Sequence, residues 1–210
     1  MKERGLIFNG EMVRAILDGR KTQTRRTVKP QPDEDGLAKV TNGPWVDSSE
    51  RNYRCPFGAA GDRIWVRETF CPVDDTQYGG EKWVDYRATP KFEESHPAGW
   101  DSAPNDAEAL KWRPSIHMPR WASRILLEIT DVRVERLNAI SEEDATAEGV
   151  PPAGSLLPDY PGTFLTPKGD FATAKVAFQR LWESIYGAEN WQANPWVWVI
   201  EFKRVEGGAA

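Results

Sequence analysis

The spacing of hydrophobic and polar positions predicts a short helix close to the start of the chain. Its apolar stripe follows the i, i+3, i+4 spacing of a helix face and is formed by Met12, Val13, Ile16 and Leu17. Asn9 precedes the stripe as a suitable N-cap, and Gly19 follows it as a residue that tolerates the left-handed conformation of a helix end. An apolar run around Leu6 predicts a strand before this helix.

Three later segments have the patterns of strands. Residues 63 to 69 partly alternate between polar and apolar after a Gly61-Asp62 turn, as in a half-buried strand. Residues 124 to 136 alternate over a longer distance, and we expect a bend near Asp131. Residues 196 to 203 have the pattern of a strand, and their continuous apolar run from 196 to 200 favours a position buried on both faces.

Two further helices follow from capping signals. Ser141, with Asp144 three residues later, resembles a capping box, and Gly149 ends the helix that it opens. Glu148 therefore belongs to the last helical turn. Residues 172 to 186 are amphipathic, and Gly187 supplies their stop signal.

The remaining sequence lacks such periodicity and is rich in Pro, Gly and polar residues. We interpret residues 31–54, 72–112 and 151–170 as loops or insertions within one domain that spans residues 1–206, and residues 207–210 as a flexible tail. Because strands outnumber helices and are unevenly spaced, the pattern favours an α+β fold built on a small mixed β-barrel over a parallel α/β sheet.

Charge and composition restrict the possible partners. The net charge is −5 and the pI is near 5.2, so any contact with nucleic acid must be local. The two cysteines and two histidines lack the spacing of a metal site, and we expect no metal and no cofactor. Neither a membrane-spanning run nor the apolar core of a signal peptide is present, which favours a cytoplasmic protein without a membrane partner.

The densest candidate chemistry lies directly after the first helix. Residues 20 to 26 carry four cations and two hydroxyls without an apolar residue: Arg20, Lys21, Thr22, Gln23, Thr24, Arg25 and Arg26. Spacing alone fits a solvated basic turn as well as a binding site.

A second candidate surface is aromatic. The chain has ten Trp, most of which we expect to pack in the core or at its edge. Trp112 and Trp121 are the best candidates for stacking on a nucleobase, because Arg113, Arg120 and Arg124 are interleaved with them.

Four sequence blocks together resemble the ASCH domain, a branch of the PUA-like superfamily found in small bacterial proteins and often in prophages. These are FNGEMVRAILDGRKTQTRR after Ile7, GDRIWVRET at 61–69, ISEEDATAEGV at 140–150 and WVWVIEFKR at 196–204. They follow the order of the family and cover rather more than half of the chain. The resemblance implies a PUA-like β-barrel with helices across its openings and a pocket beside the first helix.

The resemblance also implies site residues. One group of ASCH proteins are amidohydrolases that convert acetylcytidine into cytidine and acetate, and their implicated Lys, Thr and Glu fall on Lys21, Thr24 and Glu148 here. The Arg of the same block falls on Arg26, where it can bind phosphate or carbonyl oxygen. Arg20 and Arg25 add further cations to this substrate-binding set.

The reaction chemistry leaves several roles open. A Lys can activate a Thr hydroxyl only when it is neutral, and burial and nearby Arg side chains favour that state whereas an adjacent Glu opposes it. If Glu148 touches Lys21 directly, Lys21 suits an oxyanion or phosphate clamp, and Glu148 suits activation of Thr24 or a water. We expect a pocket that binds a nucleoside or RNA, and we expect the protein to hydrolyse an acyl-amide on that ligand. The alternatives are a non-catalytic reader of RNA or modified DNA and, last, a ribonuclease.

Overall fold

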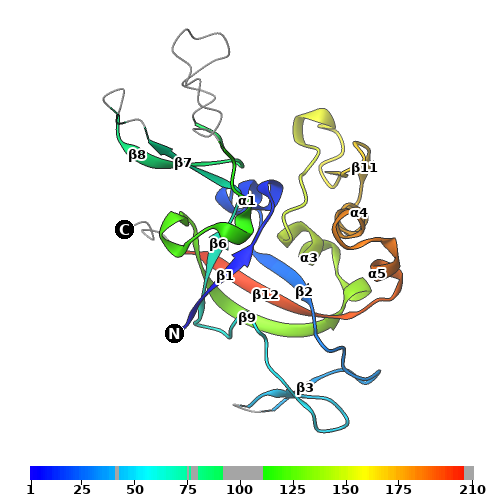
Figure 1. Ribbon diagram of the computed structural model, residues 1–210. Helices are drawn as coiled ribbons and strands as arrows, with labels where there is room; N and C mark the ends of the chain where they lie inside the picture. The colour runs from blue at the N-terminus through cyan, green and yellow to red at the C-terminus, as the bar shows by residue number, and fades with distance from the viewer. Residues whose placement is uncertain (41–42, 75, 77–79, 92–110, 206–210) are drawn as a thin grey trace. The chain divides into compact units, whose positions relative to one another are not determined.

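The computed structural model describes residues 1–40, 43–74, 76, 80–91 and 111–205, and it has an α+β fold with more strands than helices. Five strands form the main sheet in the order β1-β6-β9-β12-β2 (Figure 1). Their bounds are β1 Glu3–Ile7, β6 Arg63–Arg67, β9 Leu126–Arg136, β12 Trp196–Arg204 and β2 Gln23–Thr27. The expected α+β class is therefore confirmed.

The chain divides into two compact units. The first comprises Met1–Lys2, Ala15–Arg63 and Glu128–Lys203, and the second comprises Glu3–Arg14, Ile64–Leu127 and the chain after Lys203. The helix α1, Gly10–Leu17, begins in the second unit and ends in the first. Asn9 Oδ1 accepts a hydrogen bond from the Met12 backbone N at 2.8 Å, and Gly19 has φ +74°, so both predicted ends of this helix are confirmed.

In the first unit, β2 pairs antiparallel with β12. The register places Thr24 opposite Ile200 and Arg25 opposite Val199. Because side chains alternate along a strand, Gln23 and Arg25 share one face with Val199, and Thr24 shares the other face with Ile200. β12 is almost continuously buried from Val197 to Ile200, as its apolar run predicts.

Three helices pack on the Val199 face. They are α3 Glu142–Ala147, α4 Ala174–Tyr186 and α5 Ala188–Gln192. Their apolar side chains form one buried cluster with β12, composed of Leu137, Ile140, Ala145, Val150, Ala174, Ala177, Phe178, Trp182, Trp191, Val197 and Val199. Full burial of each large apolar side chain contributes about 1.5–3 kcal/mol, so this cluster fixes the helices against the sheet.

The predicted caps of these helices agree with the structure. Ser141 Oγ accepts from the Asp144 backbone N at 3.0 Å, and Gly149 follows with φ +86°. Gly187 ends α4 with φ +87°. α5 is not predicted by the sequence pattern.

The segments expected to be loops contain short strands. Residues 31–54 hold β3 Ala38–Lys39, β4 Trp45–Val46 and β5 Asn52–Tyr53, and residues 151–170 hold the 3₁₀ helix η5 Gly154–Leu156 and β10 Phe164–Leu165. β10 pairs with β11 Phe171–Ala172. A further 3₁₀ helix, η4 Leu137–Ala139, follows β9.

The second unit contains a hairpin where the sequence gives no regular pattern. β7 Phe70–Asp74 pairs antiparallel with β8 Lys82–Tyr86. Two 3₁₀ helices, η2 Ser115–His117 and η3 Arg120–Ala122, precede β9. The rest of the predicted 72–112 insertion, from 92 to 110, and the predicted tail at 207–210 lie outside the described residues.

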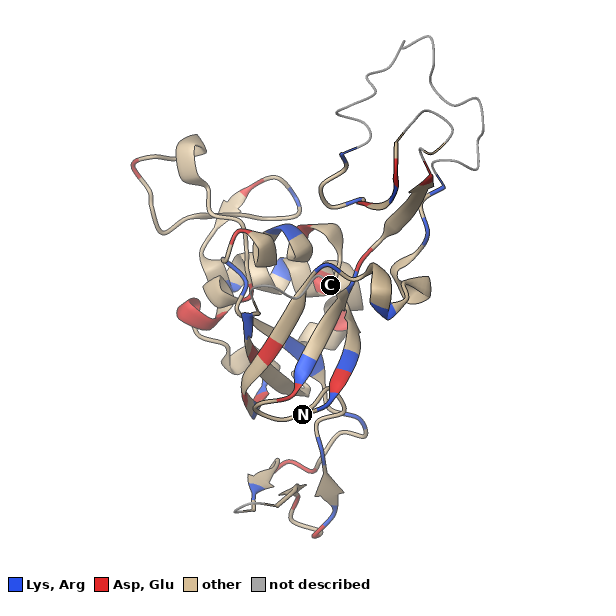
Figure 2. Ribbon diagram, turned by 90° about the vertical axis from the view of Figure 1, so that its left-hand side faces the viewer, with Lys and Arg blue, Asp and Glu red and all other residues tan. Residues whose placement is uncertain are grey.

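Charged residues of opposite sign lie next to each other on the strands (Figure 2). Lys203 of β12, for example, contacts Glu128 of β9 at 3.0 Å. Within the described part of the chain, no helix has the length and apolar character needed to span a membrane.

Candidate functional site

The segment between α1 and β2 is fixed by backbone hydrogen bonds. The backbone N atoms of Arg20 and Lys21 both donate to Ala15 O at 2.9 Å, which joins the segment to the end of α1. The Thr22 backbone N donates to Ala147 O at 2.9 Å, which joins it to α3. The cationic segment is therefore an ordered connection that leads into β2 at Gln23, and it is not the solvated basic turn that its spacing also fits.

Lys21 and Glu148 meet inside the first unit. Lys21 Nζ donates to Glu148 Oε2 at 2.7 Å and to the Glu148 backbone O at 2.8 Å. The side chains are 0% and 4% exposed, respectively. Glu148 occupies the C-cap position of α3, so the end of this helix delivers both acceptors to the ammonium group.

Arg25 binds the other oxygen of Glu148. Its Nη1 donates to Glu148 Oε1 at 3.1 Å, and its Nη2 donates to Asp144 Oδ2 at 2.8 Å and to Glu135 Oε2 at 3.2 Å. The guanidinium carbon also lies 5.9 Å from the ring centre of Phe178. Glu148 is thus held between two cations, one at each carboxylate oxygen.

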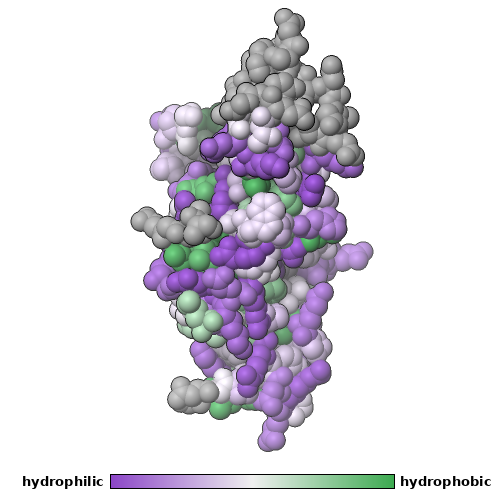
Figure 3. All heavy atoms as spheres, turned by 60° about the vertical axis from the view of Figure 1, so that its left-hand side comes forward, coloured by the Kyte–Doolittle hydropathy of each residue, from purple (hydrophilic) through white to green (hydrophobic). Residues whose placement is uncertain are grey.

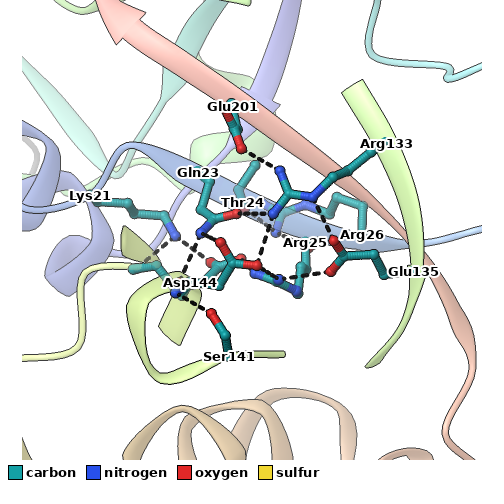
Figure 4. Close-up of polar contacts among 11 residues, drawn as sticks. Lys21, Gln23, Thr24, Arg25, Arg26, Arg133, Glu135, Ser141, Asp144 and Glu201 are labelled. Carbon is teal, nitrogen blue, oxygen red and sulfur yellow. Dashed lines mark hydrogen bonds and ion pairs between the residues drawn. The ribbon is translucent and has the colours of Figure 1, made fainter. Parts of the chain in front are cut away.

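A second layer of polar contacts surrounds Asp144. Gln23 Nε2 donates to the backbone O and to Oδ1 of Asp144, both at 2.9 Å. Arg133 Nη2 donates to Asp144 Oδ2 at 2.8 Å, and the same guanidinium contacts Glu135 and Glu201. These bonds tie β2, β9, β12 and α3 into one network (Figure 4).

Thr24 lies apart from this network. Its Oγ1 accepts from Arg26 Nη1 at 2.9 Å, and Arg26 also donates to the Arg25 backbone O. Strand alternation places Thr24 on the Ile200 face of β2, opposite the face that carries Arg25. Among the described residues, no hydrogen bond joins Thr24 to Lys21 or Glu148.

The electrostatics of the site follow from this burial. Desolvation lowers the pKa of Lys21, and the charges of Arg26 and Arg25 add to that effect, whereas the contact with Glu148 opposes it. Burial raises the pKa of Asp144, but the hydrogen bond from Gln23 and the charges of Arg25 and Arg133 outweigh it and leave that pKa below its ordinary value.

The two remaining cations of the predicted set differ in exposure. Arg20 is partly exposed and donates to Gly149 O and Asp18 Oδ2, both at 3.0 Å. Arg25, in contrast, is completely buried and contacts three carboxylates, so it has no surface from which to reach a ligand.

The two candidate stacking residues belong to the second unit. Trp112 packs against the buried Cys71 and Val73, and the Arg87 guanidinium lies 5.2 Å from its ring centre. Trp121 is 71% exposed. The structure thus gives Trp112 the packing that is usual for Trp, and leaves Trp121 open to solvent.

Sequence reasoning missed the residues that complete the network. The sequence pattern includes Gln23 only as part of the cationic segment and Asp144 only as part of a cap, and it gives no role to Arg133 or Glu135. The available signal was the spacing of two between Gln23 and Arg25 and between Arg133 and Glu135, which puts each pair on one face of a strand. Within the described residues, no group of three or more His, Cys, Asp or Glu side chains has the arrangement of a metal site.

The fold and this site define an α+β protein with a buried Lys-Glu-Arg cluster. Comparisons with protein-family models, with curated proteins and with solved structures found no match for the chain.

Proposed function

We propose that the chain is an ASCH-type protein of PUA-like fold that accepts an acylated nucleoside, such as acetylcytidine, and hydrolyses its amide. The observation that carries this proposal is the contact between Lys21 and Glu148. These two residues lie 127 positions apart, and the resemblance assigns both to the same reaction. The α1 helix, the five-stranded sheet and the order of the matching sequence blocks support the PUA-like fold.

The geometry favours a water molecule as the nucleophile. Glu148 removes a proton from the water while the water oxygen attacks the acetyl carbonyl carbon. The resulting oxyanion is held by Lys21, whose ammonium has three donors and uses two of them on Glu148. The C–N bond then breaks, and Glu148 returns the proton to the exocyclic nitrogen, giving cytidine and acetic acid, which releases its proton to solvent as acetate.

Thr24 does not fit the role of nucleophile in this arrangement. Its hydroxyl contacts Arg26 on the opposite face of β2, so neither Lys21 nor Glu148 is placed to take its proton. Thr24 and Arg26 instead suit a supporting role in the strand. Because Lys21 and Glu148 are nearly inaccessible to solvent, the proposal requires the chain around them to open when substrate binds.

A non-catalytic reader of RNA or modified DNA is the second candidate, and the burial of the pair favours it. A reader needs only the ordered connection and the partly exposed Arg20. Its ligand would contact exposed cationic groups such as Arg20 and leave the Lys21–Glu148 pair buried.

Turnover of acetylcytidine separates the two candidates. Purified protein is incubated with acetylcytidine, and cytidine is followed by chromatography. We expect Glu148→Gln to lower kcat by about 10²–10⁴-fold. Lys21→Met is expected to lower it by about 10²–10³-fold.

Lys203→Met serves as the control, because it removes an exposed cation of the same unit whose ion pair with Glu128 lies outside the network. It is expected to change kcat by less than about fivefold, since an exposed ion pair contributes at most about 1 kcal/mol. Absence of turnover by the wild type, or equal turnover by folded Glu148→Gln, rejects the enzymatic proposal in favour of a reader.

A further inference from the structure

The second unit contains a hollow that the Lys21–Glu148 chemistry does not use. It has a volume of about 320 Å³ and is lined by β7, β8 and the exposed Trp121. Pockets that hold small molecules begin at about 300 Å³, so this hollow has room for a planar ring system. Most of its lining is apolar, and two of the lining side chains are the indoles of Trp83 and Trp121.

The exposure of Trp121 is the unusual feature of this hollow. A large indole normally packs in the core or at its edge, and Trp112 in the same segment does so. Trp121 keeps 71% of its surface open to solvent. It is held there by η3, whose neighbouring Ala122 is buried and whose backbone bonds are satisfied.

The charge around Trp121 indicates the chemistry of the occupant. The segment from 111 to 127 carries Lys111, Arg113, Arg120 and Arg124 and no acidic residue of its own, but Arg124 is paired with Glu68 at 3.0 Å and adds no free positive charge. Arg120 is adjacent to Trp121 and is exposed. Its Nε donates to Glu3 at 3.0 Å, and its other four N–H groups are not used in any interaction with a described residue.

From these observations we infer that the Trp83–Trp121 hollow binds a base of a single-stranded nucleic acid, with Arg120 contacting a neighbouring phosphate. An aromatic platform beside a local positive charge is how proteins bind single strands without strong sequence preference. The Asp74–Lys82 ion pair at 2.9 Å borders the same hollow and contributes one cation and one anion there, so Arg120 carries the proposed phosphate contact.

This inference is independent of the amide chemistry, because the hollow and the Lys21–Glu148 pair belong to different units. A variant without hydrolytic activity is therefore expected to bind single-stranded nucleic acid. A variant without the Trp121 side chain is expected to keep the Lys21–Glu148 pair. The same hollow disfavours a duplex, whose bases are stacked on each other and are not available to an indole.

Fluorescence anisotropy with labelled ten-nucleotide oligo(U) and oligo(dT) tests the inference. Trp121→Ala is expected to weaken binding by about 5- to 150-fold, and Trp121→Phe by less, because a phenyl ring retains part of the stacking surface. Arg120→Ala is expected to reduce the slope of log affinity against log salt concentration by about one, which corresponds to the loss of one phosphate contact.

Two controls are matched to these variants. Ile116→Ala removes an exposed apolar side chain of the same segment that does not line the hollow, and Lys203→Met removes an exposed cation of the other unit. Both are expected to bind like the wild type. Failure of the wild type to bind either oligonucleotide, equal affinity of Trp121→Ala, or preference for a duplex would each overturn the inference.

Discussion

Glu148 accepts from Lys21 at one carboxylate oxygen and from Arg25 at the other, and all three side chains are buried. Removal of one member of such a cluster leaves an uncompensated charge inside the protein, which typically costs about 3–5 kcal/mol. The cluster is therefore stable only as a unit. The charge of a buried side chain is therefore best tested with a neutral side chain of similar size and shape.

Lys21→Met tests the protonation of the cluster. The pKa of Lys21 in the folded protein lies below 10.5, because burial disfavours the charged form. Between that lowered pKa and 10.5 the unfolded chain binds more protons than the folded one, so the stability of the wild type rises with pH. The quantity to measure is the free energy of unfolding of the wild type minus that of Lys21→Met. We expect this difference to rise with pH across the window and to level off above 10.5. A difference that falls as pH rises would mean that the ion pair raises the pKa instead.

Asp144→Asn tests the second layer of the network at the acidic end. The folded-state pKa of Asp144 is below 3.8, so its charge stabilises the folded protein above that pH. We expect the variant to lose about 1.5–3 kcal/mol near neutral pH, which is typical of hydrogen bonds to a charged group. The loss is expected to shrink as pH falls through the lowered pKa, because the wild type then loses the same charge. Denaturant unfolding at several pH values measures this, and a loss that is constant with pH would contradict it.

For individual residues, the sequence indicates the Lys21–Glu148 pair but not the directions in which the side chains of β2 point. The motif resemblance marks Lys21 and Glu148, which the structure brings into contact. It gives no sign that Thr24 and Arg25 face opposite ways, because that depends on β2 beginning at Gln23 and on its register with β12. A run of cations looks solvated in the sequence, whereas here carboxylates from α3 and β9 neutralise Arg25.

Among the secondary-structure elements, α3 positions the site. It has only six residues, and its C-terminal end places Glu148 and Gly149 against the segment that precedes β2. Gly149 has φ +86°, and a Cβ there would lie 2.7 Å from the Cβ of Lys21 and 2.9 Å from that of Ala15. The close approach of α3 to Lys21 therefore requires glycine at this position.

Gly149→Ala is expected to destabilise the protein more than Gly187→Ala. Both glycines have positive φ, but a Cβ at Gly187 meets nothing within 4 Å. The backbone cost is therefore common to both variants, and overpacking at Gly149 adds about 1–3 kcal/mol. Thermal or denaturant unfolding measures the difference. Equal destabilisation would mean that α3 does not lie as close to Lys21 as described.

Helices and long strands are predictable from this sequence because their signals are local. Asn9, Ser141 and Gly187 mark helix ends through their own backbone or side-chain preferences. The short strands β3, β4 and β5 carry no such signal, since two residues become a strand only through the partner with which they pair. The same holds for the β7–β8 hairpin, whose first strand contains Pro72.

Across the whole molecule, the α+β class follows from the number and spacing of the predicted strands. The order of strands in the sheet does not, because it depends on pairings between segments far apart in the sequence. Hydrophilic side chains cover most of the face shown in Figure 3, with only small hydrophobic patches between them. With a net charge of −5, the proposed binding to nucleic acid depends on local groups and is expected to weaken as salt is added.

The most direct test of the central claim compares Thr24→Val with Glu148→Gln in acetylcytidine hydrolysis. In the proposed reaction the Lys21–Glu148 pair and a water perform the chemistry, so Thr24→Val is expected to retain kcat within about tenfold of the wild type, whereas Glu148→Gln loses at least about 100-fold. Mass spectrometry of the protein during turnover is expected to show no acetyl group on Thr24. An inactive but folded Thr24→Val, or an acetylated Thr24, would contradict the account.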